Sequence, residues 1–197
     1  MAERLVRISA AEPGQADRAC KSRAAPRQTP RPPSFDELVA EERERVGRLC
    51  YRLLGWQADV EDVVQDVFLA ALKALPKFRG ESTVSTWLTR IAVNACRGHG
   101  RKQRLRIFAM SQQRSEPRLD RSPEGKLMDR ERFERVRTAI RRLPVKYREV
   151  VVLRYLEEMA VSEIGQVLGL GRNAVEVRLN RARQWMKEDL AGVVESG

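Results

Sequence analysis

Hydrophobic positions recur at helical spacing from Ser34 onward. Pro33, Ser34 and Glu37 form a start signal, because Ser34 can cap a helix and Glu37 occupies the capping-box position. The first apolar stripe, which ends at Gly55, consists of Phe35, Leu38, Val39, Val46, Leu49, Cys50, Leu53 and Leu54. The second, over residues 59–75, consists of Val60, Val63, Val64, Val67, Phe68, Ala71, Leu72 and Leu75. A third stripe begins near Ser82 and consists of Val84, Trp87, Leu88, Ile91, Ala92 and Ala95. These stripes predict three packed helices.

The second half of the chain shows the same spacing after a polar stretch with Pro117 and Pro123. Its stripes consist of Phe133, Val136, Ile140 and Leu143, then Tyr147, Val150, Val151 and Tyr155, then Ile164, Val167 and Leu168 after a capping Ser162, and finally Val175, Leu179, Ala182 and Met186 within residues 173–190. No segment has the period of a strand. We therefore predict an all-α protein of two small helical domains, at 34–106 and 129–192, joined by a flexible linker at 107–128. Residues 1–33, basic and rich in proline, predict a disordered tail.

Charge and composition narrow the class of partner. The chain has 38 Lys and Arg against 27 Asp and Glu, a net charge of +11, which favours a polyanionic partner. No run of about 18 apolar residues occurs, so no membrane insertion is expected. The first residues lack the apolar stretch of a secretory signal, and a cytoplasmic protein is expected.

The residues that could carry catalysis or bind a metal are few. The chain has three widely spaced cysteines and one histidine, so buried thiols are favoured over a zinc site, and neither metal nor cofactor is expected. No phosphate-binding loop of the Walker type is present. Because the acids of the second predicted helix lie away from the basic clusters, a nucleic-acid enzyme is disfavoured.

The second and third predicted helices of the first domain carry opposite charges on their polar sides. The polar side of the second helix carries Asp59, Glu61, Asp62, Gln65 and Asp66, which repel DNA and suit a basic protein surface. Acids in a first turn also complement the helix dipole, but Asp66 lies deeper than that. Opposite its apolar stripe, the third helix carries Arg90, Asn94, Arg97 and Arg101, which suit phosphates and bases. Trp87 could stack on a base, but its place in the stripe favours the core.

The segment from Ser162 to Arg183 has the plan of a helix-turn-helix. Gly169 makes the turn, and the small Gly165 permits a close approach of the two helices. The outward side of the second helix carries residue types that reach base edges and phosphates, namely Arg172, Asn173, Glu176, Val177, Asn180 and Arg181. A helical hairpin with a polar outside is the structural alternative.

Four ordered motifs resemble those of RNA polymerase sigma factors. They are DVEDVVQDVF at 59–68, FRGES at 78–82 followed by STWLTRIAVN at 85–94, LPVKYREVVVLRY at 143–155, and EIG at 163–165 leading to VEVRLNRAR at 175–183. The match spans residues 35–190, and a short linker joins the two conserved domains. The chain is thus identified as a member of the extracytoplasmic-function (ECF) group, which lacks further domains between these two.

The resemblance implies a role for each surface. It places Asp62, Gln65, Asp66 and Phe68 where the family grips the clamp helices of the largest subunit of the polymerase core, with Phe68 also suited to the core of the domain. Asn94, Arg97 and the loop 80–85 fall where the family opens the minus-ten element of promoter DNA and captures a flipped base. The expected minus-ten surface consists of Arg90, Asn94, Arg97 and Arg101. The residues that fall where it reads the minus-thirty-five element are Arg172, Asn173, Glu176, Val177 and Arg181. An anti-sigma factor is expected by the same analogy.

The sequence departs from the family pattern at three places. Glu176 stands where many members carry Lys, Asn173 where many carry Gly or Ser, and Val84–Ser85 replaces a commoner aromatic–Arg pair. These departures affect the promoter sequence that is read. An autonomous helix-turn-helix regulator is the alternative function, although it leaves the acidic helix face without a purpose.

Overall fold

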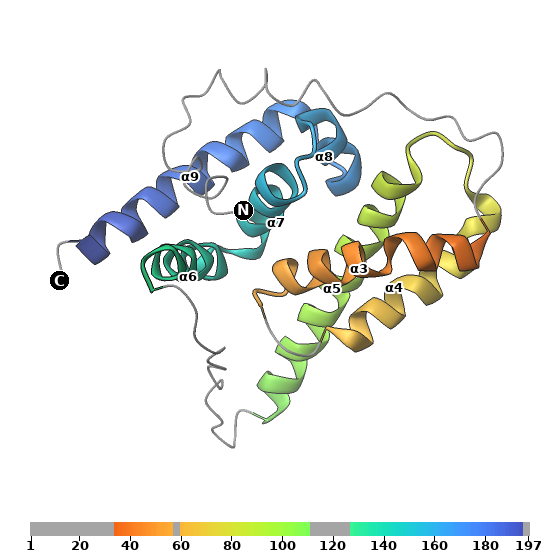
Figure 1. The fold of residues 1–197 in the computed structure, drawn as a ribbon, viewed down its shortest axis with the longest axis horizontal. Coiled ribbons are helices and arrows are strands. Elements are labelled where there is room, and N and C mark those ends of the chain that lie inside the picture. The colour runs from red at the N-terminus through yellow and green to blue at the C-terminus, as the bar shows by residue number, and fades with distance from the viewer. Residues whose placement is uncertain (1–33, 57–59, 111–126, 195–197) are drawn as a thin grey trace.

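The computed structural model describes residues 34–56, 60–110 and 127–194, and these ranges contain helices and no strand (Figure 1). The predicted tail, and Asp59, lie outside them. In chain order the elements are α3 Phe35–Leu53, α4 Glu61–Ala74, η1 Leu75–Lys77, α5 Val84–Met110, α6 Leu127–Arg142, α7 Val145–Val151, η2 Val152–Leu156, α8 Val161–Leu168 and α9 Arg172–Val194. The all-α prediction is confirmed.

The start and end of α3 are set by the residues that the sequence singled out. The backbone N–H of Ser34 donates to Glu37 Oε2 at 2.8 Å, and the N–H of Glu37 donates to Ser34 Oγ at 3.3 Å. This is the predicted capping box. At the other end Gly55 adopts φ +79°, which turns the chain out of the helix as predicted.

Helices α4 and α5 differ in detail from the prediction. Leu72 was predicted to be buried, but it is 48% exposed on α4. Helix α5 begins at Val84, near Ser82 as predicted, and Thr83 Oγ1 accepts from the N–H of Thr86 at 3.1 Å. Its fully buried apolar residues are Leu88, Ala92, Val93 and Cys96, whereas Val84, Trp87, Ile91 and Ala95 are half-buried. The buried arc is rotated because α5 packs on α3 and α4 and also contacts α8.

The second helix group contains α6 to α9, and the described members of its predicted apolar stripes are buried or half-buried, while the side chain of Phe133 lies outside the description. Val175, Leu179, Ala182 and Met186 of α9 are all buried. Ser162 was predicted to cap α8, but it lies inside that helix, which begins at Val161. Glu163 closes the helix start instead, because its Oε2 accepts from the N–H of Ala160 at 2.8 Å.

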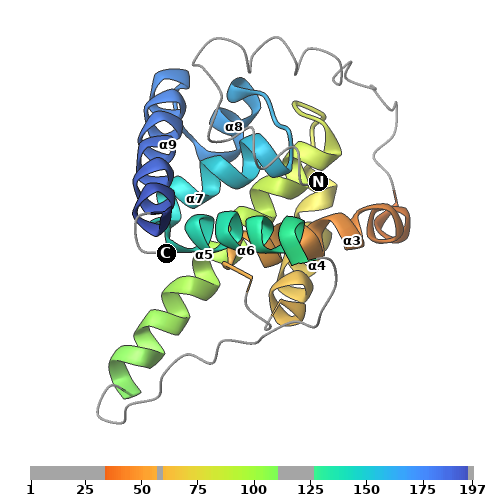
Figure 2. The ribbon, with the colours of Figure 1, turned by 60° about the vertical axis from the view of Figure 1, so that its left-hand side comes forward.

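The two helix groups, α3–α5 and α6–α9, pack against each other. Their buried apolar residues form one continuous cluster, in which α3 contacts α7 and η2, and α5 contacts α8. Figure 2 shows α8 above the first half of α5. The predicted linker 107–128 is helical at both ends, since α5 reaches Met110 and α6 begins at Leu127, and the segment between lies outside the described residues. Two helix groups are thus present as predicted, but they share one core.

Candidate polymerase-docking and nucleic-acid surfaces

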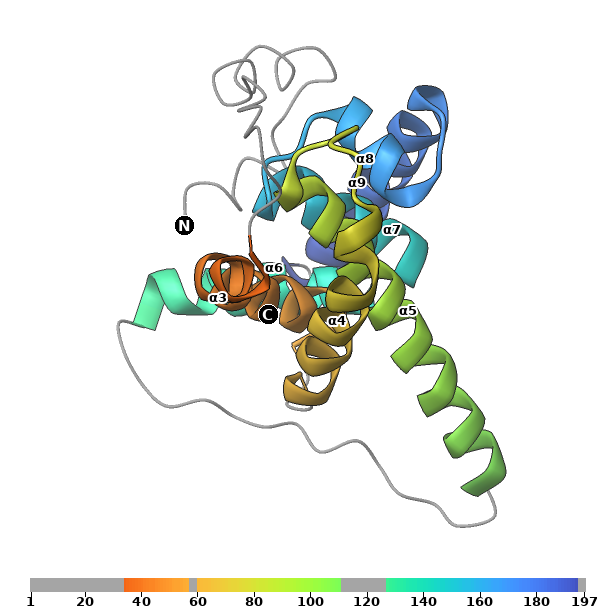
Figure 3. The same cartoon turned by 90° about the vertical axis from the view of Figure 1, so that its right-hand side faces the viewer.

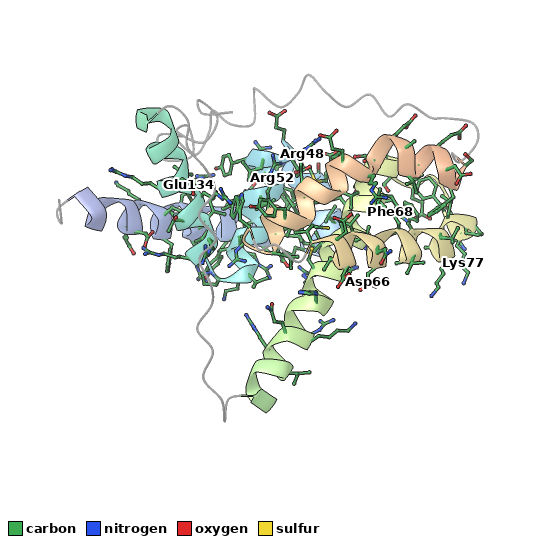
Figure 4. The ribbon with its side chains drawn as sticks, turned by 60° about the horizontal axis from the view of Figure 1, so that its bottom comes forward. Arg48, Arg52, Asp66, Phe68, Lys77 and Glu134 are labelled. Atoms are coloured by element: carbon green, nitrogen blue, oxygen red, sulfur yellow. The ribbon has the colours of Figure 1, made fainter. Side chains whose placement is uncertain are left out.

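The acidic face of α4 consists of Glu61, Asp62, Gln65 and Asp66, all of which are exposed. Phe68 points the other way. It is 8% exposed and packs in the core, and Figure 4 shows it between α3 and α4 while Asp66 lies on the outward side. Asp62, Gln65 and Asp66 therefore form one accessible face, whereas Phe68 supports that face from inside.

Two leucines extend the acidic face, namely Leu69, which the sequence analysis did not name, and Leu72, which it placed in the buried stripe. Leu69 is 53% exposed and Leu72 is 48% exposed. Leu69 follows Gln65 by four residues and Asp66 by three, so it lies on the same side of the helix. Its position off the buried stripe was the available signal. Exposed leucines beside carboxylates give the face an apolar part that could be buried against another protein.

The basic face of α5 is only partly open. Arg90, Asn94 and Arg101 are exposed. Arg97 is not, because its Nε and Nη2 donate to Glu149 Oε1 and Oε2 of α7, each at 2.7 Å. The hydrogen bond to Glu149 raises the pKa of Arg97. The structure therefore brings three of the four predicted minus-ten residues to one exposed side and holds the fourth in an ion pair with the other helix group.

The second half of α5 stands clear of the body, as Figure 3 shows. Its exposed side chains include Arg101, Lys102 and Arg104, and Gly98 and Gly100 lie where it leaves the body. At the other end of the helix, Val84 and Ser85 already belong to the first turn, so the predicted loop 80–85 is shorter than expected. Trp87 is half-buried and packs on Phe78 with ring centroids 5.2 Å apart, so it belongs to the domain surface rather than fully to its core.

The helix-turn-helix is formed by α8 and α9 as predicted. Gly169 ends α8 in the left-handed region with φ +69°, and the N–H of Leu170 donates to the carbonyl of Gly165 at 2.9 Å. A Cβ on Gly165 would lie 2.7 Å from the backbone oxygen of Leu170. The turn therefore depends on glycine at both positions.

We expect Gly165→Ala to lower the free energy of unfolding by about 1–3 kcal/mol, because the added methyl group meets a backbone atom that has little room to move. Thermal unfolding followed by circular dichroism measures the change. Gly171→Ala is the matched control, since a Cβ there meets nothing within 4 Å. Equal melting temperatures for the two variants would show that the turn can relax.

The outward side of α9 carries the predicted reading residues. Arg172, Asn173, Val177, Asn180 and Arg181 are exposed, and Val177 is 48% exposed. Glu176 is half-buried and accepts from Arg172 Nε at 2.9 Å. This arrangement presents two arginines, two amides and an apolar side chain at the spacing that suits a major groove.

The start of α7 adds residues to this surface that the sequence reasoning did not include. A hydrogen bond from Arg181 lowers the pKa of the Tyr147 hydroxyl, so α7 and α9 meet there. Lys146 lies over the Tyr147 ring, with Nζ 5.0 Å from its centroid. The positive surface of the helix-turn-helix thus continues onto α7.

The two described cysteines are buried in the first helix group, as predicted for Cys50 and Cys96. A hydrogen bond with Cys50, followed by burial, raises the pKa of the Cys96 thiol. Among the described residues, no three His, Cys, Asp or Glu side chains gather as a metal site would require. No described helix has both the length and the apolar character of a membrane span.

Comparisons with known proteins match both helix groups. Residues 38–106 match the Sigma-70 region 2 family and residues 133–186 the Sigma-70 region 4 family. The chain is 33% identical to RNA polymerase sigma factor CnrH of Cupriavidus metallidurans, over 76% of this chain and 83% of that protein. It is 29% identical to ECF RNA polymerase sigma factor SigW of Bacillus subtilis, over 80% and 89%. With the ECF RNA polymerase sigma-E factor of Escherichia coli the identity is 31%, over 77% and 83%.

Solved structures agree with these matches. CnrH in complex with the cytosolic domain of CnrY aligns with a TM-score of 0.57 at 30% identity, over 90% of this chain and 98% of that one. The sigma factor RpoE in complex with the anti-sigma factor NepR from Bartonella quintana aligns with a TM-score of 0.66 at 20% identity, over 80% and 96%, and so supports the fold. From the ordered motifs, the two helix groups and these relatives together, it follows that the chain belongs to the RNA polymerase sigma factors of the ECF group.

Proposed function

We propose that this ECF sigma factor binds core polymerase through α4 and promoter DNA through α5 and α9. The observation that carries the proposal is the separation of charge in a chain of net +11. Asp62, Gln65 and Asp66 give α4 an acidic face, with Leu69 and Leu72 beside it. Clamp helices of the largest core subunit are the proposed partner of this face, with Phe68 holding its shape from the core.

The proposed minus-ten surface lies on α5. Arg90, Asn94 and Arg101 are exposed there, and Arg97 joins them when its pairing with Glu149 is broken. Arginines neutralise phosphates and asparagine can bond an unpaired base. The basic second half of α5, which stands clear of the body, would follow the DNA backbone.

The proposed minus-thirty-five surface lies on α9, at Arg172, Asn173, Glu176, Val177 and Arg181. We expect Arg172→Ala to weaken binding of the upstream element by about 1–3 kcal/mol, because a bidentate arginine–base contact has that value. Fluorescence anisotropy with specific and scrambled duplexes measures it. Lys187→Ala, an exposed cation further along α9, is the control. Equal loss on both duplexes would mark Arg172 as a phosphate contact.

We further propose that the chain has no catalytic activity of its own and that an anti-sigma factor regulates it. The RpoE structure contains the anti-sigma factor NepR, and the CnrH structure contains the cytosolic domain of CnrY. A protein that covers both helix groups would block core and promoter together.

One experiment tests the main proposal. The purified chain is mixed with sigma-free core polymerase at low ionic strength, and the complex is analysed by size-exclusion chromatography. The same complex then transcribes a library of genomic fragments, and the start sites are mapped. We expect co-migration and a shared sequence upstream of the starts. Failure to co-migrate would overturn the polymerase role, and tight binding of a specific duplex by the chain alone would favour an autonomous regulator.

A further inference from the structure

Two buried carboxylates of the second helix group hold arginines of the first. Glu149 of α7 pairs with Arg97 of α5 through two bonds of 2.7 Å, and its side chain is 6% exposed. Glu157, which follows η2, pairs with Arg52 of α3 at 2.8 Å and with Arg45 at 3.5 Å, and its side chain is 9% exposed. Figure 4 shows Arg52 at the end of α3 that faces the second group. We call these five residues the interdomain latch.

The ion pairs of the interdomain latch can break and re-form at little cost in free energy. Burial raises the pKa of Glu157, while Arg52 and Arg45 lower it, so desolvation opposes the gain from pairing. Buried ion pairs commonly come close to breaking even for this reason. If the two helix groups part, all five side chains regain water. The latch therefore fixes how the groups meet without locking them together.

The arginine that the latch occupies is also a proposed DNA contact. Glu149 takes the Nε and Nη2 donors of Arg97 in a fork, and a phosphate group would take the same two donors. The same two donors cannot serve both partners at once, and while they hold Glu149 only the Nη1 hydrogens and one Nη2 hydrogen of Arg97 are left for a phosphate. The carboxylate of Glu149 thus stands in the place of a phosphate.

The closed packing is also too small to span a promoter. A compact body of 142 residues, the number that the structure describes, has a radius of gyration of about 14 Å, hence a diameter of about 40 Å. Elements centred at minus ten and minus thirty-five are about 25 base pairs apart, or about 85 Å along straight duplex at 3.4 Å per pair. In the closed packing α8 lies on α5, so the two DNA surfaces cannot separate. Promoter binding requires the groups to part.

We propose that the closed packing is an autoinhibited state, in which Glu149 and Glu157 occupy Arg97, Arg52 and Arg45 and DNA competes with Glu149 for Arg97. This rests on the proposed function, because it takes Arg97 as a minus-ten contact. The inhibitor is thus a part of the chain itself, and it acts by imitating the charge of the DNA backbone.

The test uses the full chain with Glu149→Gln and Glu157→Gln combined, which removes both charges and keeps the side-chain size. We expect small-angle X-ray scattering to show a larger radius of gyration. Binding of a single-stranded minus-ten oligonucleotide should tighten about tenfold, because affinity rises with the open fraction. The control is Glu41→Gln with Glu44→Gln, an equal charge change at two exposed acids of α3, and it should change neither quantity.

Each result is decisive. A double variant that stays compact, or that expands without binding DNA more tightly, overturns the autoinhibition. Adding Arg97→Ala to the double variant separates the two proposals. If the gain in affinity is lost, Arg97 is the contested residue. If the variant opens and the gain in affinity survives, Glu149 does not compete with DNA for Arg97. The autoinhibition by Glu149 and the role of Arg97 as a minus-ten contact are then both wrong. The proposal that α4 binds core polymerase does not depend on this result.

Discussion

Replacing Asp62 and Asp66 together by arginine is expected to reduce the affinity for core polymerase by at least about 100-fold. Both carboxylates are exposed on one side of α4, and neither is needed by the buried stripe on the other side. Reversal places like charges across the proposed interface, which costs several kcal/mol, and each 1.4 kcal/mol is tenfold in affinity. Size-exclusion chromatography and a fluorescence titration against core polymerase measure the loss.

The control for this variant must carry the same change of net charge. Glu41→Arg with Glu44→Arg provides it, because both glutamates are exposed on α3. The α4 variant should melt slightly below the α3 variant, because Asp62 lies in the first turn of α4 and its carboxylate complements the helix dipole by about 0.3–1 kcal/mol. If the α3 variant loses as much affinity as the α4 variant, the net charge of the chain and not the acidic face of α4 governs binding to core polymerase.

Phe68→Ala is expected to lower the free energy of unfolding by about 3–5 kcal/mol, the range for removing a large aromatic side chain from a core. Phe68 is 8% exposed and lies in the cluster formed by α3, α4 and α5. A loss of that size rivals the whole stability of a small helical unit. Urea unfolding followed by circular dichroism measures it.

The same helix offers the matching control. Leu72→Ala removes a side chain of similar apolar character that is 48% exposed, and we expect a change within about 0.5 kcal/mol. It should instead weaken docking, if Leu72 is buried against the polymerase. A stable Phe68→Ala variant that fails only in polymerase binding would mean that Phe68 contacts the partner directly.

Helix positions could be predicted because each helix buries one side and ends on a recognisable residue. Ser34 with Glu37 and Gly169 did act as a cap and a turn. Ser162 failed as a cap because Glu163 closes the start of α8 from inside the helix. A sequence pattern cannot separate two neighbouring polar residues that could each satisfy the same backbone group.

The interdomain contacts could not be predicted from the sequence. Glu149 and Glu157 are ordinary acids in a chain with 27 Asp and Glu, and nothing local marks them as partners of arginines more than 50 residues away. The rotated buried arc of α5 has the same origin, since the pattern of one helix does not reveal a second neighbour such as α8. Arg97 was therefore assigned to an open surface that the packing closes.

Helix α5 is long for the body that holds it. Its 27 residues extend about 40 Å, and Figure 3 shows its second half projecting from the rest of the molecule. Because the helix is rigid, a slight tilt of its N-terminal half displaces Arg101 and Arg104 in the second half by a larger distance. Gly98 and Gly100 lie near the middle of this helix, and a helix bends most easily at such residues because they have no side chains. Any protein that tilts the N-terminal half of α5 by a small angle would thereby change the direction in which these basic side chains point.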